Sequence, residues 1–393
     1  MEREGQERIE SYLMRRVVIV VVLLFLLSGC WDLEEADRMD YVHGIGVDYK
    51  NDKVTVYIQI VNLGTLGNTE GGSSGESDQV TIASASADNI NSAVFNIYKS
   101  AQRRLYWGHD TFVILTEEAL EQNLMKNALD LIDRYRETRY RIRIFSTKDD
   151  LEGLLKASPA FDGSPIFTRL TDIDNTYEQS SRIKDISIRE LLISLHEPGH
   201  NGMIPAVGIT DNTWETEKEP KQMIESVGVA IATPNNFNGF ITGDDINGLR
   251  WMQRDSKRNN VSVYKDGKPA SEVIIVKPKV SFDITKKGEK VIFNATVNAK
   301  GIINEVLQDI DQKFLVKELE KNIKKEIMQT YKKALEIDAD IYRLSEKLYR
   351  RDLKTWKKIE KKGEIKLDEN SLQVKVNIDL VNSKLNNIKP IVE

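Results

Sequence analysis

Residues 53–60 read Lys53-Val54-Thr55-Val56-Tyr57-Ile58-Gln59-Ile60, with apolar and polar side chains in alternation. A period of two is typical of a β-strand that buries one face. The preceding segment, Tyr41 to Asp48, is also largely apolar, and Lys50-Asn51-Asp52 separates the two segments with residues that favour turns. The sequence therefore predicts a β-hairpin with one buried face.

Strands and helices alternate beyond this hairpin. Residues 63–79 are rich in Gly, Ser, Asn and Glu, and this low apolar content predicts a mobile loop. The elements predicted next are a strand at Val80–Ala85, a helix from Asp88 capped by Asp88 or Asn89, a strand at Thr111–Leu115, a helix from Glu117, a strand at Arg141–Phe145 and a helix at Lys148–Lys156. Such alternation predicts an α/β domain, to which we assign residues 30–180.

Two further domains are predicted after residue 180. The middle domain, residues 181–256, is expected to contain a helix at Ser187–His196, a strand at Met223–Ala232, a turn at 234–236 and a helix near Asp244–Gln253. A polar hinge at 254–260 leads to the C-terminal domain, residues 257–393. Its predicted strands are Glu272–Ile284 and Lys290–Ala299, joined at Lys286-Lys287-Gly288, and Leu372–Leu380. The expected fold class is α+β, with three mixed α/β domains, each a β-sheet with flanking helices.

A long helix is predicted between the last two of these strands. Apolar residues recur every four positions at Leu315, Leu319, Ile323, Ile327, Tyr331 and Leu335, which gives an amphipathic helix with one apolar stripe. A second helix, Ile341 to Lys358, is expected to pack beside it. We expect the stripe to pack on the C-terminal sheet, and the alternative is a groove for a partner helix.

The N-terminus has the features of a lipoprotein signal peptide, assigned to residues 1–29. Arg15 and Arg16 precede an apolar run from Val17 to Leu27, which is too short to span a bilayer but fits the apolar region of a signal peptide. The run ends in the lipobox Leu27-Ser28-Gly29-Cys30. Cleavage before Cys30 and lipidation of its thiol are therefore predicted. Since two acyl chains, such as palmitate, give stable anchoring, we expect a membrane protein held on the outer face.

Four acidic residues in the first ten, Glu2, Glu4, Glu7 and Glu10, are unusual for the start of a signal peptide. Initiation at Met14 instead of Met1 would give a leader of ordinary length that begins Met-Arg-Arg. We therefore expect translation to start at Met14.

Composition narrows the possible classes of protein. Cys30 is the only cysteine, so once it is lipidated disulfides and cysteine metal sites are excluded. The chain has 56 Lys and Arg against 61 Asp and Glu, a net charge of −5. This balance predicts no general polybasic face for nucleic acid or anionic lipid, and therefore no nucleic-acid partner.

The string His196-Glu197-Pro198-Gly199-His200 matches the zinc-protease pattern of two histidines that flank a glutamate. That chemistry requires a helix through both histidines, so that both reach the metal. Pro and Gly terminate helices, so we expect the helix to end at His196, near the negative end of its dipole, and no zinc site to form.

The remaining motifs carry no clear chemistry. His43 and His109 lack a second ligand at a useful spacing, and Gly44-Ile45-Gly46 lacks the third glycine of a phosphate loop. Residues 103–109 fit a basic and aromatic recognition patch and a helix C-terminus followed by a turn equally well. No catalytic residue, cofactor site or metal site is predicted, so we expect a protein that is not an enzyme.

Several strings together resemble the Ger(x)C family of spore germination lipoproteins. They are Gly29-Cys30-Trp31-Asp32 with Glu35, Gly46 with Asp48, Arg103-Arg104-Leu105-Tyr106 with Gly108-His109, Asp133-Arg134 with Glu137 and Arg139, Asp338 to Trp356 with Asp340 and Tyr349, and Val374-Lys375-Val376-Asn377-Ile378. Family members often end the last strand near a glycine, where this chain has Asn382-Ser383. The likeness extends over nearly the whole mature chain.

The resemblance implies a function and partners. Members are the C subunits of nutrient germinant receptors, tethered to the spore's inner membrane, and they act with integral-membrane A and B subunits to trigger germination. The implied protein is a non-enzymatic receptor subunit anchored through Cys30. The alternative is a solute-binding lipoprotein of a membrane transporter, although the two halves of the sequence show no duplication around a ligand cleft.

Overall fold

The computed structural model describes residues 13–19, 38–61, 80–135, 137–138, 141–157, 168–171, 174–215, 220–234, 236–288, 290–361 and 363–381. Tyr41–Ala101 and Leu105–Glu393 form one compact unit, and Met1–Asp40 with Gln102–Arg104 form a small second unit. Three predicted features lie outside the described residues: the lipobox at 27–30, the loop at 63–79 and the segment Asn382-Ser383.

A ten-stranded mixed sheet forms the N-terminal part of the large unit, in the order β10-β9-β8-β6-β5-β1-β2-β3, with β4 paired to β1 and β7 to β6. The strands are β1 (Met39–Lys50), β2 (Lys53–Val61), β3 (Val80–Ala87), β4 (Arg104–Tyr106), β5 (Phe112–Thr116), β6 (Arg143–Thr147), β7 (Ile186–Ser187), β8 (Gly202–Thr210), β9 (Met223–Ala232) and β10 (Phe237–Thr242).

The predicted hairpin is confirmed. β1 and β2 pair antiparallel, with Lys50 opposite Lys53 at the turn. Asn51 and Asp52 have φ angles of 52° and 58°, the left-handed conformation that these residue types tolerate best after glycine. Since the paired strands lie in the middle of the sheet, both of their faces are largely buried, rather than one.

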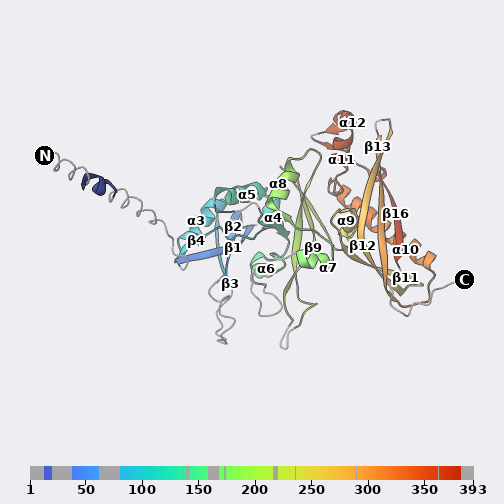
Figure 1. Ribbon diagram of the computed structural model, residues 1–393, viewed down its shortest axis with the longest axis horizontal. Helices are drawn as coiled ribbons and strands as arrows, with labels where there is room; N and C mark the ends of the chain where they lie inside the picture. The colour runs from blue at the N-terminus through green and yellow to red at the C-terminus, as the bar shows by residue number, and fades with distance from the viewer. Residues whose placement is uncertain are drawn as a thin grey trace, which may run out of the picture. The chain divides into compact units, whose positions relative to one another are not determined.

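Helices cover both faces of this sheet (Figure 1). One core joins the sheet to α3 (Ile90–Tyr98), α4 (Glu117–Glu121), α5 (Met125–Arg134) and α8 (Ile188–His196). A smaller core on the other face contains residues of α6 (Leu151–Lys156). Asn89 caps α3 by accepting a hydrogen bond from the Ser92 backbone, so Asn89 rather than Asp88 is the cap. A short helix, α7 (Asp174–Gln179), follows in the chain.

Strands from residues 181–256 extend the same sheet. β8 pairs parallel with β6 through Ser146 and Ala206, and β9 and β10 continue outward from β8. Strands on both sides of the predicted boundary at residue 180 thus belong to one sheet. The division into three domains stays a prediction.

A second, four-stranded sheet has the order β11-β12-β13-β16. Its strands are β11 (Arg258–Lys265), β12 (Lys268–Lys287), β13 (Lys290–Val306) and β16 (Leu372–Val381). The expected polar hinge at 254–260 is wrong in its second half, because residues 258–260 begin β11 and pair with β12. Ser256 and Asn259 are buried there and hydrogen-bonded to each other, which a polar composition does not reveal.

The long helix is α10 (Gln312–Glu336), and Figure 1 shows it running along the C-terminal sheet. Leu315, Leu319, Ile323, Ile327 and Tyr331 are buried in a core shared with the strands, so the prediction that the stripe packs on this sheet is confirmed. The same core takes in Val229 and Ile231 of β9 and Trp251 of α9 (Leu249–Met252), which joins the two sheets.

The predicted helix at 341–358 is two helices, α11 (Leu344–Arg351) and α12 (Leu353–Ile359). The break is at Asp352, whose side chain caps α12 by accepting from the Thr355 backbone at 3.0 Å and forms an ion pair with Lys286. These contacts fix Asp352 outside helical geometry, at φ −147°. The hairpin β14 (Glu360–Lys361) and β15 (Glu364–Ile365) follows.

The predicted α+β class is confirmed by these mixed sheets and their flanking helices. Within the described part of the chain, no helix is long and apolar enough to cross a membrane.

Candidate functional site

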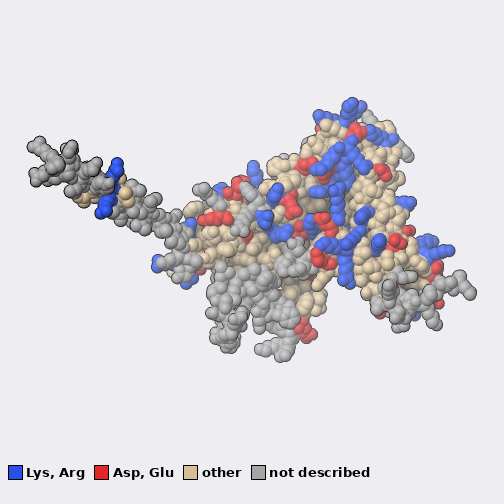
Figure 2. Space-filling model, in the orientation of Figure 1, with Lys and Arg blue, Asp and Glu red and all other residues tan. Residues whose placement is uncertain are grey.

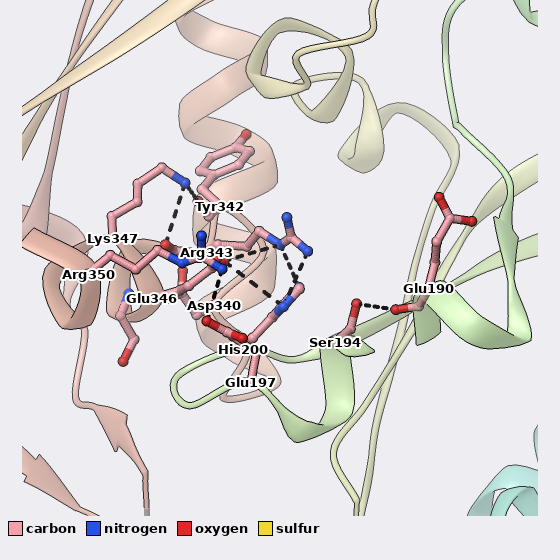
Figure 3. Close-up of polar contacts among 11 residues, drawn as sticks. Glu190, Ser194, Glu197, His200, Asp340, Tyr342, Arg343, Glu346, Lys347 and Arg350 are labelled. Atoms are coloured by element: carbon pink, nitrogen blue, oxygen red, sulfur yellow. Dashed lines mark hydrogen bonds and ion pairs between the residues drawn. The ribbon is translucent and has the colours of Figure 1, made fainter. Parts of the chain in front are cut away.

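A cleft of about 560 Å³ lies where α8 and the following turn face α11. This volume is within the range of small-molecule sites, roughly 300–1,000 Å³. Apolar side chains such as Ile193, Met252 and Phe282 line it, and five basic and three acidic side chains stand among them. Figure 3 shows polar residues of α8, of α11 and of the segments next to them.

The wall formed by α8 depends on well-defined ends of that helix. Ser187 and Glu190 form a capping box at its start, with reciprocal side-chain and backbone hydrogen bonds. The helix ends at His196, as predicted, and the His196 Nδ1 atom lies 2.7 Å from the carbonyl oxygen of Leu192. The chain then turns through Gly199, whose φ of +69° favours glycine.

His200 enters the cleft beyond this turn and contacts α11. Arg343 Nε donates to His200 Nε2 at 2.5 Å, and His200 Nδ1 lies 4.0 Å from Glu346 Oε2. Burial, followed by the charges of Arg343, Lys347 and Arg350, lowers the pKa of His200 to about 3. The imidazole is therefore neutral near pH 7, which leaves Nε2 free to accept from the guanidinium.

Asn201 makes a second set of contacts across the same junction. Its side-chain oxygen accepts from the Asp340 backbone N–H at 2.8 Å, and its amide nitrogen donates to Glu364 Oε1 at 2.8 Å. Asp340 Oδ2 accepts from the Ser345 backbone at 2.7 Å. Burial raises the pKa of Asp340 to about 6. These bonds tie the start of β8 to the segments on both sides of α11 and α12.

Two further cations of α11 line the cleft. Lys347 Nζ donates to the Tyr342 carbonyl oxygen at 2.6 Å and lies 4.5 Å from the centre of the Phe282 ring. Burial lowers the pKa of Lys347 to about 8. Arg350 pairs with Glu197 and with Glu346, each at 2.9 Å. The charged side chains on this wall thus mostly form hydrogen bonds and ion pairs with other residues of the protein.

The hydroxyl groups near the cleft are also engaged. Ser194 Oγ donates to the Glu190 carbonyl oxygen at 2.8 Å, which turns it back onto its own helix. Ser345 Oγ accepts from Trp356 Nε1 at 3.1 Å and from the Ile365 backbone at 3.2 Å. Neither hydroxyl is directed at a general base, which nucleophilic catalysis requires. The arrangement is suited to joining two parts of the fold and to binding.

The zinc-protease string does not form a helix through both histidines, because α8 ends at the first one. His200 instead faces Arg343. Among the described residues, no three His, Cys, Asp or Glu side chains lie close enough together to hold a metal ion.

The other sequence candidates lie apart from this cleft. His43 is buried in β1 and bonds Gln59 at 2.9 Å, and His109 packs edge-on against Tyr41. Gly44 and Gly46 pair with β2 and β5 inside the sheet.

The string from Arg103 to His109 is not a helix C-terminus, since α3 ends at Tyr98 and residues 104–106 form β4. Arg103 forms a long ion pair with Asp40 at 4.0 Å, and Trp107 is buried. Cys30, the predicted lipid attachment site, lies outside the described residues.

Sequence reasoning missed the roles of Asn201, Arg343 and Lys347. Asn201 follows a predicted turn, where an asparagine is ordinary, and its partners are more than a hundred residues away. Arg343 has a φ of +57°, for which a single sequence holds no signal. Asp340 is indicated by the sequence only through the family resemblance. For Asn201, the only local indication in the sequence is its place before Gly202 and an apolar strand, which predicts a turn and not a contact with a distant segment.

Comparison with known proteins covers both halves of the fold. A family model described as "Spore germination protein N-terminal domain" matches residues 32–209, and one described as "Spore germination B3/ GerAC like, C-terminal" matches residues 227–384. The gap between the two matches falls at the hairpin between β8 and β9.

Two curated relatives come from Bacillus subtilis (strain 168). "Spore germination protein KC" is 26% identical and aligns over 88% of this chain and 90% of its own. "Putative spore germination protein YfkR" is 21% identical over 83% and 85%. A solved structure, "Crystal Structure of the GerBC protein", superposes with a TM-score of 0.53 at 16% identity, covering 89% of this chain and 99% of that one. This last likeness concerns the fold.

Proposed function

The chain belongs to the GerAC-like family of spore germination proteins, the C subunits of germinant receptors, and on that premise we propose that it is a lipid-anchored receptor subunit. In this role it acts with integral-membrane A and B subunits in the nutrient response that triggers germination. Its place is the outer face of the spore's inner membrane.

The observation that carries the proposal is the position of the lipobox. The N-terminal family match begins at residue 32, two residues after the cysteine of Leu27-Ser28-Gly29-Cys30. An acylated cysteine at this point would tether the whole folded chain through a short segment. Two acyl chains on Cys30 supply stable anchoring, and anchoring raises the concentration of the subunit near membrane partners.

A role without catalysis is supported by the cleft between α8 and α11. His200 is neutral and bonded to Arg343, and Ser194 and Ser345 are hydrogen-bonded within the fold. The His200–Arg343 hydrogen bond supports the junction between the two sheets, and the two hydroxyl groups are bonded within their own parts of the fold. A rigid junction of this kind holds binding surfaces in fixed positions, as a subunit of a complex requires.

The anchor is tested by comparing wild type with Cys30→Ala and with Ser28→Ala, which keeps a small residue in the lipobox. We expect membrane retention and a diacylglyceryl group on the N-terminal peptide, detected by mass spectrometry, in wild type and Ser28→Ala. Cys30→Ala should lack the lipid and show a slowed nutrient response in spores. An unmodified wild-type Cys30, or a normal response in the variant, would contradict the proposal.

A further inference from the structure

α11 and α12 carry a cluster of basic side chains on their outer side. We define the α12 basic surface as Arg350, Arg351, Lys354, Lys357, Lys358 and Lys361, all of which are exposed. Figure 2 shows Lys and Arg side chains gathered over α11 and α12 at the top of the view. The chain as a whole is acidic, with a net charge of −5. Positive charge is therefore concentrated on this surface, although the net charge of the whole chain is negative.

Acidic residues of the same segment are held by partners within the fold. Glu346 is buried and pairs with Arg350, and Asp352 caps α12 and pairs with Lys286. Glu360 accepts the backbone N–H of Gly363 at 2.9 Å. Because these carboxylates are directed to internal partners, they neutralise the lysines of α12 only weakly.

Four lysines of this surface remain without partners. Within the described ranges, the side chains of Lys354, Lys357, Lys358 and Lys361 form no hydrogen bond or ion pair. The first three stand at i, i+3 and i+4, so they share one face of α12. Their ammonium groups are free to contact an external anionic partner.

The opposite face of α12 fixes this orientation. Trp356 is buried, lies edge-on to Tyr349 with ring centres 5.0 Å apart, and donates to Ser345 Oγ. Exposing a buried aromatic side chain of this size is energetically unfavourable, so α12 cannot rotate to bury its lysines. The basic face is thus a fixed part of the fold.

Leu353 distinguishes between classes of anionic partner. It is 44% exposed at the start of α12, beside Lys354 and Arg351. An apolar side chain among cations suits the interface of a membrane, where lysines meet headgroups while the apolar group enters the acyl boundary. A nucleic-acid backbone offers no such apolar contact at its phosphates.

We propose that the α12 basic surface binds a membrane rich in anionic phospholipid, with Leu353 inserted among the headgroups. The lysines supply the attraction, which acts within a Debye length of the surface and weakens as salt is added. This contact would orient the folded body on the bilayer. It goes beyond the proposed receptor role and does not depend on the A and B partners.

The test uses the mature polypeptide from residue 30 with Cys30→Ser, which removes the lipid but keeps the whole folded chain. Co-sedimentation is measured with vesicles of phosphatidylcholine alone and with vesicles that also contain phosphatidylglycerol. The variant is Lys354→Glu/Lys357→Glu/Lys358→Glu. The matched control, Lys313→Glu/Lys317→Glu/Lys325→Glu, reverses three exposed lysines of α10 and changes the net charge equally. Circular dichroism verifies that each protein is folded.

We expect the protein to bind only the vesicles that contain phosphatidylglycerol, and this binding should be lost at high salt. The α12 variant should reduce the affinity roughly tenfold or more, and the control by less than about threefold. Leu353→Ser should weaken binding without changing its salt dependence. Free inorganic phosphate should not compete. The proposal is overturned by equal binding to both vesicle types, by equal losses in variant and control, or by binding to duplex DNA but not to vesicles.

Discussion

Asn201 accepts a hydrogen bond from the backbone N–H of Asp340 at 2.8 Å, and this contact joins the residue before β8 to the segment that leads into α11. The same asparagine donates to Glu364, beyond α12. One buried side chain thus holds two distant stretches of the C-terminal part against the ten-stranded sheet. Its replacement should weaken the whole junction.

Asn201→Ala is therefore expected to lower the free energy of unfolding by about 2 kcal/mol, because it leaves the buried Asp340 N–H and the partly buried Glu364 carboxylate without their partners. Urea unfolding followed by fluorescence measures the change. Asn304→Ala, at an exposed position of β13, is the control and should change stability by less than about 0.5 kcal/mol. Equal effects of the two variants would show that Asn201 does not support the junction.

Gly199 should tolerate no side chain. An added Cβ would lie 2.5 Å from Ser345 Oγ, and the φ of +69° is itself unfavourable for alanine. Gly267, with a φ of +76° and open space around its Cα, isolates the backbone effect. We expect Gly267→Ala to cost about 1 kcal/mol and Gly199→Ala about 1–3 kcal/mol more, measured by thermal unfolding. Similar costs would mean that the turn moves freely away from α11.

The pH dependence of stability should contain opposing contributions from His200 and Asp340. His200 has a folded pKa of about 3 against 6.5 unfolded, so the unfolded chain binds more protons and its contribution to stability rises with pH between these values. Asp340 has a folded pKa of about 6 against 3.8 unfolded, so its contribution falls with rising pH across that window. Each slope is at most about 1.4 kcal/mol per pH unit.

Single variants separate these contributions. Between pH 4 and 6, His200→Gln should make the change of stability with pH more negative, and Asp340→Asn should make it more positive. Urea unfolding at several pH values provides the test, with His109→Gln, at an exposed histidine, as the control. A wild-type pH profile in both variants would show that neither group titrates abnormally.

Zinc should not bind at His196 and His200. His196 is the last residue of α8, whereas His200 lies beyond the turn that follows it. The His200 ring already accepts a hydrogen bond from Arg343. Metal analysis of the purified protein after equilibration with zinc should find less than one ion per chain. Stoichiometric zinc that disappears in His200→Ala would contradict this geometry.

Local patterns in the sequence predicted many elements of the fold. Alternation in residues 53–60 and the four-residue stripe of α10 correspond to β2 and to a helix buried against the C-terminal sheet. In each case the periodicity of buried side chains matches the geometry of the element, so a single sequence carries the signal. The end of α8 at His196 followed from Pro198 and Gly199.

Elements defined by distant contacts were not predictable in this way. β8 contains Pro205 and Gly208 and carries a weak strand signal, yet it pairs with β9 over its whole length and extends the large sheet. The split at Asp352 depends on Lys286, in β12. The junction of His200 with Arg343 and of Asn201 with Asp340 spans about 140 residues, a separation at which local propensity holds no information.

The most direct test of the central claim is co-purification from detergent-solubilised spore inner membranes, with wild type compared with Cys30→Ala. We predict that A- and B-type receptor subunits accompany the wild-type protein, and that the variant loses both membrane retention and these partners. Recovery of the wild-type protein with a transporter permease, or with neither receptor subunit, would contradict the assignment to a germinant receptor.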